Sequence, residues 1–159
     1  DGQGDAHVSF AVSANRAIVD VDPDLGLVRV VELTTPQDVG RVLNPLQAVG
    51  QLEGGAAQGV GLAVMEEVLV SDGRIRNASF TDYLVPTALD MPPVEIALLI
   101  EQPEPGAPFG AKGIGEPPCI SSTAAVVAAL RDATGLALAR VPVRPVDTAL
   151  GGDAPGMDR

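Results

Sequence analysis

The feature that most restricts the fold is a glycine-rich segment that still has the pattern of a long helix. Asn44 and Pro45 have the form of a helix start, with an asparagine N-cap and a proline at the first helical position. The predicted helix runs to about Glu67. Its interior contains Gly50, Gly54, Gly55, Gly59 and Gly61. Each glycine weakens a helix by up to ~1 kcal/mol relative to alanine. Such a helix is tolerated where a ligand or a packed neighbour must come very close to its backbone.

Short strands precede this helix. Alternating apolar residues between Val8 and Thr34, interrupted by turn residues at 22–26, predict two strands joined as a hairpin. A second hairpin is expected over 68–80, around the turn at 71–73, and a buried strand over 94–100.

A second helix is expected from Pro117 to about Ala133, closed by Gly135. The tail from Val141 onward is rich in proline and glycine and is expected to form a surface strap or a frayed end. The sequence therefore predicts an α+β fold in which mixed or antiparallel strands and hairpins pack with two main helices.

Composition excludes several classes of function. Aromatic residues make up only 3% of the 159 residues, so the core must be aliphatic and base-stacking platforms for nucleic acid are missing. A net charge of −11 would repel a phosphate backbone, which argues against a nucleic-acid partner. No apolar run has the length of a membrane span, so no membrane partner is expected.

The single cysteine, Cys119, cannot form an internal disulfide or hold an iron–sulfur cluster. The single histidine, His7, could not complete a zinc site with it, and we expect no metal ligand from this chain. A reducing, cytoplasmic location fits this cysteine usage.

The segment Gly-Ala-Lys-Gly-Ile-Gly-Glu-Pro-Pro at 110–118 places Glu116 between a glycine loop and a helix start. A carboxylate there can take or give a proton. The simpler interpretation is a first-turn acid that stabilises the helix dipole by ~0.3–1 kcal/mol. The alternative from another class of function is a nucleotide-binding loop. The segment lacks both the Gly-Lys-Ser/Thr sequence and the G-x-G-x-x-G spacing that such loops need.

Several segments in series resemble the molybdenum hydroxylases, the family of xanthine dehydrogenase, xanthine oxidase and aldehyde oxidase. The segments are 38–45, 50–55, 58–61 and 110–118, with 82–86 and 141–145 agreeing in order and approximate spacing. The resemblance runs from Phe10 to Val146 and concerns the last part of the molybdopterin-binding large subunit. It implies that residues 1–146 are the C-terminal portion of a molybdopterin-binding domain and that 147–159 are a tail.

The resemblance also implies roles for individual residues. Glu116 matches the general base of the family, which takes a proton from a hydroxyl on molybdenum before that oxygen attacks an electrophilic carbon. Gln58 matches a glutamine near the cofactor, and Lys112, Gly113 and Gly115 match the loop that borders it. Because a direct ion pair would make Glu116 a poorer base, we expect the Lys112 ammonium to point toward another anion or a carbonyl.

The implied cofactor is molybdenum–molybdopterin, shared with segments outside this chain, while 2Fe-2S and FAD are expected on partner domains or subunits. The expected partners are the upstream part of the molybdenum-binding subunit and the iron–sulfur and FAD subunits. Because 140–145 looks like bacterial xanthine dehydrogenases, a purine such as xanthine or hypoxanthine is the first-choice substrate. Aldehydes, other N-heterocycles and a non-catalytic fragment remain alternatives. No turnover is expected from the isolated chain.

Overall fold

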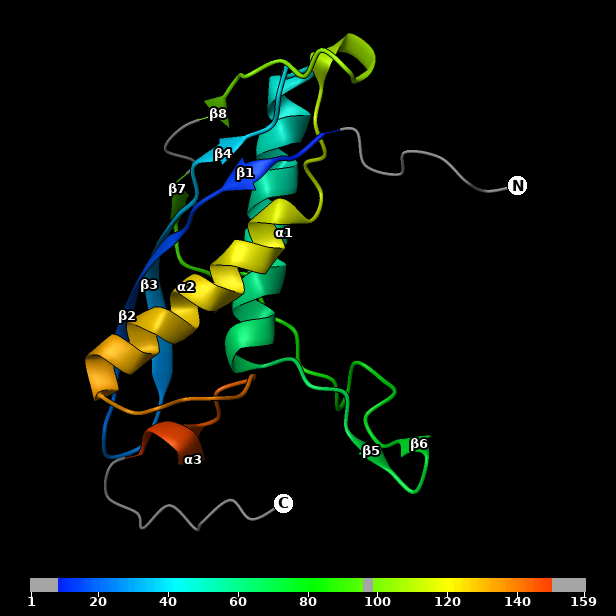
Figure 1. The fold of residues 1–159 in the computed structure, drawn as a ribbon. Helices are drawn as coiled ribbons and strands as arrows, with labels where there is room; N and C mark the ends of the chain where they lie inside the picture. The colour runs from blue at the N-terminus through cyan, green and yellow to red at the C-terminus, as the bar shows by residue number, and fades with distance from the viewer. Residues whose placement is uncertain (1–8, 96–98, 150–159) are drawn as a thin grey trace.

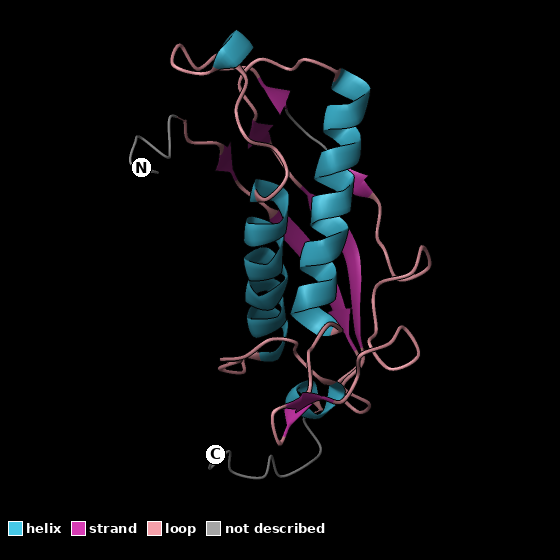
Figure 2. Cartoon of the chain, turned by 90° about the vertical axis from the view of Figure 1, so that its right-hand side faces the viewer, coloured by secondary structure: helices cyan, strands magenta, loops and turns pink. Residues whose placement is uncertain are grey.

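Two long helices cross on one side of a set of short strands. The computed structural model describes residues 9–95 and 99–149. Helix α1 (Pro45–Val64) and helix α2 (Pro117–Thr134) pack against each other, and α2 also packs against strand β2 (Arg16–Val21). Figure 1 shows this crossing, and Figure 2 shows both helices on the same side of the strands. The predicted α+β architecture with two main helices is confirmed.

Six short strands form two three-stranded sheets, and each of three chain segments contributes one strand to both sheets. The strands are β1 (Val12–Ser13), β2, β3 (Val28–Thr34), β4 (Gln37–Asp38), β7 (Val94–Glu95) and β8 (Leu99–Ile100). One sheet has the order β1-β4-β8 and the other β2-β3-β7, each with one antiparallel and one parallel pairing. At the interruption, the Ala14 amide donates to the Pro36 carbonyl at 3.2 Å. Proline has no N–H to donate to a ladder, which fits a break at this point.

The hairpin predicted between Val8 and Thr34 is confirmed for residues 16–34. Strands β2 and β3 are antiparallel, and the turn between them closes with a 2.8 Å hydrogen bond from the Gly26 amide to the Asp22 carbonyl. Ala17, Val19 and Val21 alternate with exposed residues along β2 and face the core. The expected strand over 94–100 is represented by β7 and β8, and residues 96–98 between them lie outside the described part.

Helix α1 begins as its sequence predicts, because the Asn44 side chain accepts a 3.1 Å hydrogen bond from the Gln47 amide. It ends at Val64, three residues before the expected end, where Met65 leaves the helical conformation. The glycines that matter for packing are those facing α2. A Cβ on Gly55 would overlap the Pro118 ring, and one on Gly59 would lie 2.9 Å from the Cys119 carbonyl oxygen. The close neighbour is therefore the start of α2.

The core lies between the two helices and one face of β2 and β3. Its buried members are Val30, Leu33, Ala56, Val60, Ala63, Val126, Leu130, Leu138 and Val143. The set is aliphatic throughout, as the shortage of aromatic residues requires. Helix α2 ends as expected at Gly135, which has a φ of 71° and donates its amide to the Arg131 carbonyl at 2.8 Å.

The expectation of a surface strap or frayed end from Val141 is wrong for residues 141–149. Val143 is buried, and its amide donates to the Ala63 carbonyl at 2.7 Å. A short helix, α3 (Pro145–Thr148), follows, and the buried Thr148 hydroxyl donates to the Gly26 carbonyl at 2.7 Å. Backbone hydrogen bonds to distant residues hold this segment in place, and its proline content alone could not reveal them. Residues 150–159 of the expected tail are outside the described part.

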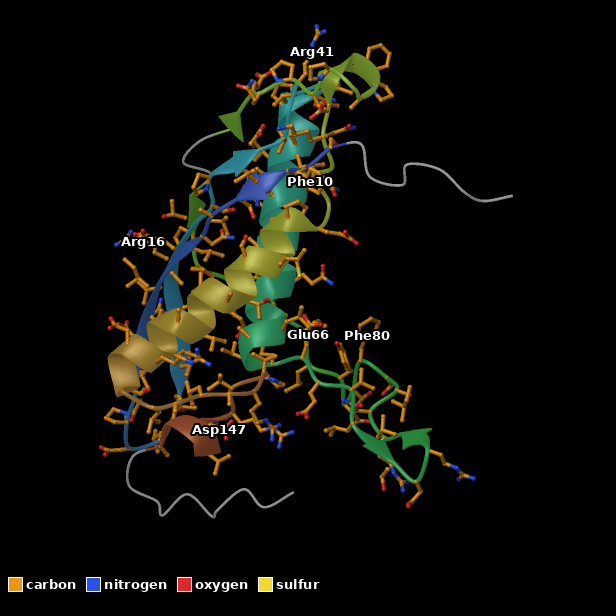
Figure 3. The ribbon with its side chains drawn as sticks, viewed as in Figure 1. Phe10, Arg16, Arg41, Glu66, Phe80 and Asp147 are labelled. Carbon is orange, nitrogen blue, oxygen red and sulfur yellow. The ribbon has the colours of Figure 1, made fainter. Side chains whose placement is uncertain are left out.

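The segment after α1 leaves the body of the molecule, as Figure 1 shows. It contains the predicted hairpin as two short strands, β5 (Val70–Ser71) and β6 (Arg74–Ile75). Phe80 on this arm is 87% exposed (Figure 3). None of the helices within residues 9–95 and 99–149 is long and apolar enough to cross a membrane.

Candidate functional site

Three segments that are far apart in the sequence meet at the N-terminal end of α1. They are residues 39–44, the first turns of α1 and the loop 111–114, and they enclose a cleft of about 210 Å³. Two backbone hydrogen bonds join the first and third: the Lys112 amide donates to Val39 at 3.0 Å, and the Arg41 amide donates to Gly110 at 2.8 Å. Figure 3 shows Arg41 at this end of the molecule, beside the short 3-10 helix η1 (Pro108–Gly110) that opens the glycine loop.

One glycine in this junction is required by its backbone. Gly40 has a φ of 65°, and a Cβ there would lie 2.9 Å from the Lys112 amide nitrogen. The left-handed conformation and the close approach of the loop therefore both exclude a side chain. This position lets residues 39–44 and 110–114 lie side by side as one wall of the cleft.

The Lys112 side chain turns into the protein. Its ammonium lies 2.5 Å from Asp38 Oδ2, and only 8% of the lysine side chain and 11% of the aspartate side chain are exposed. Lys112 therefore pairs with another anion, as expected, while its aliphatic part lines the cleft. Burial raises the pKa of Asp38, but hydrogen bonds from Lys112, the Gly40 amide and the Gln102 amide outweigh it, and the pKa lies below its usual value.

Two glutamines on the same face of α1 differ in their distance from the glycine loop. Gln51 lines the cleft, and its Oε1 lies 4.0 Å from the position that a Cβ on Gly115 would occupy. Gln58, the predicted cofactor residue, is exposed two turns further along and does not line the cleft. Sequence reasoning missed Gln51, although its spacing of seven residues from Gln58 already placed both on one helix face.

The loop glycines leave open space around their backbone. Within the described residues, chain neighbours apart, no atom lies within 4 Å of a Cβ built on Gly113, and the near atom for Gly115 is Oε1 of Gln51 at 4.0 Å. Both glycines are exposed. A ligand can thus approach the backbone of this part of the loop.

Glu116 follows at the N-cap of α2. Its side chain is exposed and makes no capping hydrogen bond, while its carbonyl accepts the Cys119 amide at 3.0 Å. The backbone of Glu116 is thus hydrogen-bonded into the start of α2, while its exposed carboxylate can contact another group. The nearby Cys119 is half-buried, and burial, followed by the negative charge of Glu66, raises the pKa of its thiol. A neutral thiol is a poor nucleophile, so Cys119 is not a candidate reactive group of this turn.

Comparison with known proteins identifies the family. Residues 1–92 match the family model described as molybdopterin cofactor-binding domain. The chain belongs to this family of molybdenum hydroxylases. It is 42% identical over 130 residues to the 6-hydroxypseudooxynicotine dehydrogenase complex subunit gamma of Paenarthrobacter nicotinovorans, a match that covers 80% of this chain and 16% of that protein.

Other relatives in the molybdenum hydroxylase family are named for different activities. The xanthine dehydrogenase molybdenum-binding subunit of Escherichia coli O157:H7 is 37% identical, over 91% of this chain and 20% of its own length. The crystal structure of quinoline 2-oxidoreductase from Pseudomonas putida 86 superposes with a TM-score of 0.75 at 38% identity, over 81% of this chain and 17% of that one. The chain thus spans a fifth or less of the length of these relatives.

The cleft of this molybdenum hydroxylase segment is lined by polar side chains beside apolar ones. The Arg41 guanidinium suits a phosphate group, and the amides of Gln47 and Gln51 can donate to and accept from a polar heterocycle. The bare backbone at Gly113 and Gly115 lets a ring approach. Among residues 9–95 and 99–149, no group of three or more His, Cys, Asp or Glu side chains could hold a metal ion. The described residues therefore fit the organic part of the cofactor.

Proposed function

We propose that this chain completes the molybdenum site of a hydroxylase and supplies Glu116 as the general base. One observation carries the proposal: segments 39–44, 45–51 and 111–114 converge on one cleft, and Glu116, two residues after the last of them, has a carboxylate without a capping hydrogen bond. Each of these segments belongs to the motifs that resemble the family. The bound cofactor supplies the redox chemistry of hydroxylation, with molybdenum held by its pterin.

The residues of this chain would have separate tasks. Arg41, Gln47 and Gln51 would bind the cofactor through the cleft, and Gly113 and Gly115 would let it approach the loop. Gln51 is better placed for this than Gln58, which stays a weaker candidate. Lys112 would contact the cofactor only through the aliphatic part of its side chain, which lines the cleft, because its ammonium is paired with Asp38. Glu116 would accept the proton of the hydroxyl whose oxygen is transferred to the substrate carbon.

The first-choice substrate is xanthine or hypoxanthine, supported by the 37% identity to a xanthine dehydrogenase subunit over 91% of the chain. A second candidate is another N-heterocycle, which is favoured by the higher identity of 42% to a subunit of 6-hydroxypseudooxynicotine dehydrogenase. An aldehyde is the third, supported by 33% identity to the aldehyde oxidoreductase of Megalodesulfovibrio gigas. Partner subunits carrying 2Fe-2S and FAD, and a cytoplasmic location, belong to the same proposal.

The test is Glu116→Gln in the complete enzyme, assayed with xanthine, a pyridine-type heterocycle and an aldehyde. Loss of a general base typically lowers the rate by ~10²–10⁴-fold. We expect kcat to fall in that range on the best substrate while molybdenum content is unchanged. Glu104→Gln is the matched control, because Glu104 is a partly exposed acid in the loop before η1 and does not line the cleft. A fall of less than tenfold for Glu116→Gln would assign the base to another residue.

A further inference from the structure

The start of α2 is held from two sides, and the second side involves a polar cluster that the proposed function does not use. On the first side, Pro118 packs against Gly55 of α1. On the second, the Pro117 carbonyl faces the junction between β1 and β2. Ser121 Oγ donates to this carbonyl at 3.0 Å, and Ser13 Oγ lies 3.2 Å from it. Each of the two prolines after Glu116 is thus fixed by a different element.

Ser121 is the centre of this cluster. Its oxygen lies 2.7 Å from Ser13 Oγ and 2.5 Å from Asn15 Nδ2, which donates to it. A serine hydroxyl has one proton to donate and two lone pairs to accept with. Ser121 accepts from Asn15 and gives its proton either to the Pro117 carbonyl or to Ser13, which can itself donate to that carbonyl. In either arrangement the two serines and Asn15 link the strands to the first turn of α2.

Asn15 reaches Ser121 from the short gap between two strands. Residues 14–15 separate β1 from β2, and Asn15 turns its amide toward α2 there. Ser13 and Asn15 are two residues apart, and both are half-buried between exposed neighbours, as side chains on one face of an extended chain are. This face joins the strands to the first turn of α2, 106 residues further along the chain.

We infer that Ser121, held by Asn15 and Ser13, is a positioning residue for Glu116. This inference rests on the proposed function of Glu116. The Glu116 side chain has no capping hydrogen bond of its own, so the location of its carboxylate depends on where the backbone of 116–118 is held. Removing the Ser121 hydroxyl breaks the link between Asn15 and the first turn of α2, so this turn can shift, and a misplacement of about 1 Å in a reacting group costs up to ~10²-fold in rate.

The test uses the complete molybdenum enzyme and the substrate that it oxidises fastest among xanthine, a pyridine-type heterocycle and an aldehyde. We expect Ser121→Ala to lower kcat about 10- to 100-fold, with KM within about twofold and molybdenum content unchanged. Ser121→Thr keeps the hydroxyl and is expected to recover most of the rate. Asn15→Ala removes the donor from the other side and is expected to change kcat in the same direction.

A double-mutant cycle separates positioning from a merely structural role. If Ser121 acts through the Glu116 carboxylate, Ser121→Ala changes the rate less than about twofold once Glu116 is glutamine. Two outcomes overturn the inference and leave the proposed function intact. One is an equal fold-change in kcat from Ser121→Ala in the native and the Glu116→Gln backgrounds. The other is a normal kcat in Ser121→Ala alone. Normal kcat in Glu116→Gln alone overturns the proposed function and the inference with it.

Thr134→Val is the matched control. Thr134 Oγ1 donates to the Leu130 carbonyl at 2.7 Å, four residues back on the same helix, as Ser121 does to Pro117. It lies at the far end of α2, so its loss tests the helix without moving the first turn. We expect kcat to stay within about twofold, and a fall equal to that of Ser121→Ala would assign the effect to helix stability and overturn the inference.

Discussion

Lys112 is the single lysine of the chain, and it forms a nearly buried ion pair with Asp38 beside the cleft. Lys112→Met would leave the Asp38 carboxylate without its ammonium while it is largely shielded from water. Removing one partner of a buried pair costs about 3–5 kcal/mol. We expect the free energy of unfolding, measured with urea at neutral pH, to fall by about 3 kcal/mol. Arg16→Met is the control, since the Arg16–Glu32 pair is exposed and worth at most ~1 kcal/mol. Equal losses would contradict this.

The same pair makes stability depend on pH. The pKa of Asp38 is lowered in the folded chain, so the ionised form is favoured by folding. Its contribution is complete above the unfolded pKa of ~3.9 and disappears as the pH falls through the lower folded value. Urea unfolding between pH 6 and pH 3 should therefore show a steeper loss of stability below about pH 4 in the native chain than in Asp38→Asn. Parallel curves would exclude this role of Asp38.

At the scale of the element, the glycines of α1 fall into two groups. Gly59 faces α2, where an added Cβ would meet the Cys119 carbonyl oxygen at 2.9 Å, whereas Gly54 has no atom within 4 Å. Gly59→Ala should destabilise the chain by about 1–3 kcal/mol because the helices must separate. Gly54→Ala should stabilise it by up to ~1 kcal/mol through helix propensity. Thermal unfolding of the two variants checks this, and shifts of the same sign would show that α2 does not set the glycine pattern.

Signals that act within one element were readable from the sequence. The Asn44 cap, the closing Gly135 and the turn at Asp22–Gly26 each depend on a few neighbouring residues. The expectation that Lys112 pairs with an anion other than Glu116 followed from the base role that the family resemblance implies for Glu116. The identity of that anion did not, because Asp38 lies 74 residues away and reaches Lys112 only through the pairing of Gly40 with Ala111.

The choice between Gln51 and Gln58 shows the same limit. Both are on one face of α1, and only the point at which α2 crosses that helix decides which is nearer to Gly115. The buried segment around Val143 was missed for a related reason. Its place depends on the free Ala63 carbonyl at the end of α1, which no local pattern near Val143 reveals.

At the scale of the whole molecule, large apolar side chains are exposed both near the site and far from it. Leu46 at the start of α1 is 83% exposed, Phe109 in η1 76%, and Leu89 on the projecting arm 98%. Exposed apolar residues grouped beside a cleft are typical of surfaces that another chain or segment covers. Since the chain spans 16–20% of the length of its first relatives, this agrees with a site that other segments complete.

The isolated chain is therefore expected to show no turnover. Glu116 and Gln51 are both exposed in it, so neither faces a dry pocket in which a proton transfer would be directed at a bound substrate. The measurement compares the purified chain with the complete enzyme, using molybdenum content and reduction of an electron-accepting dye with xanthine or a pyridine-type heterocycle. The complete enzyme should oxidise at least one of them, and the chain alone none. Oxidation by the chain alone, with molybdenum bound, would mean that 159 residues suffice to build the site.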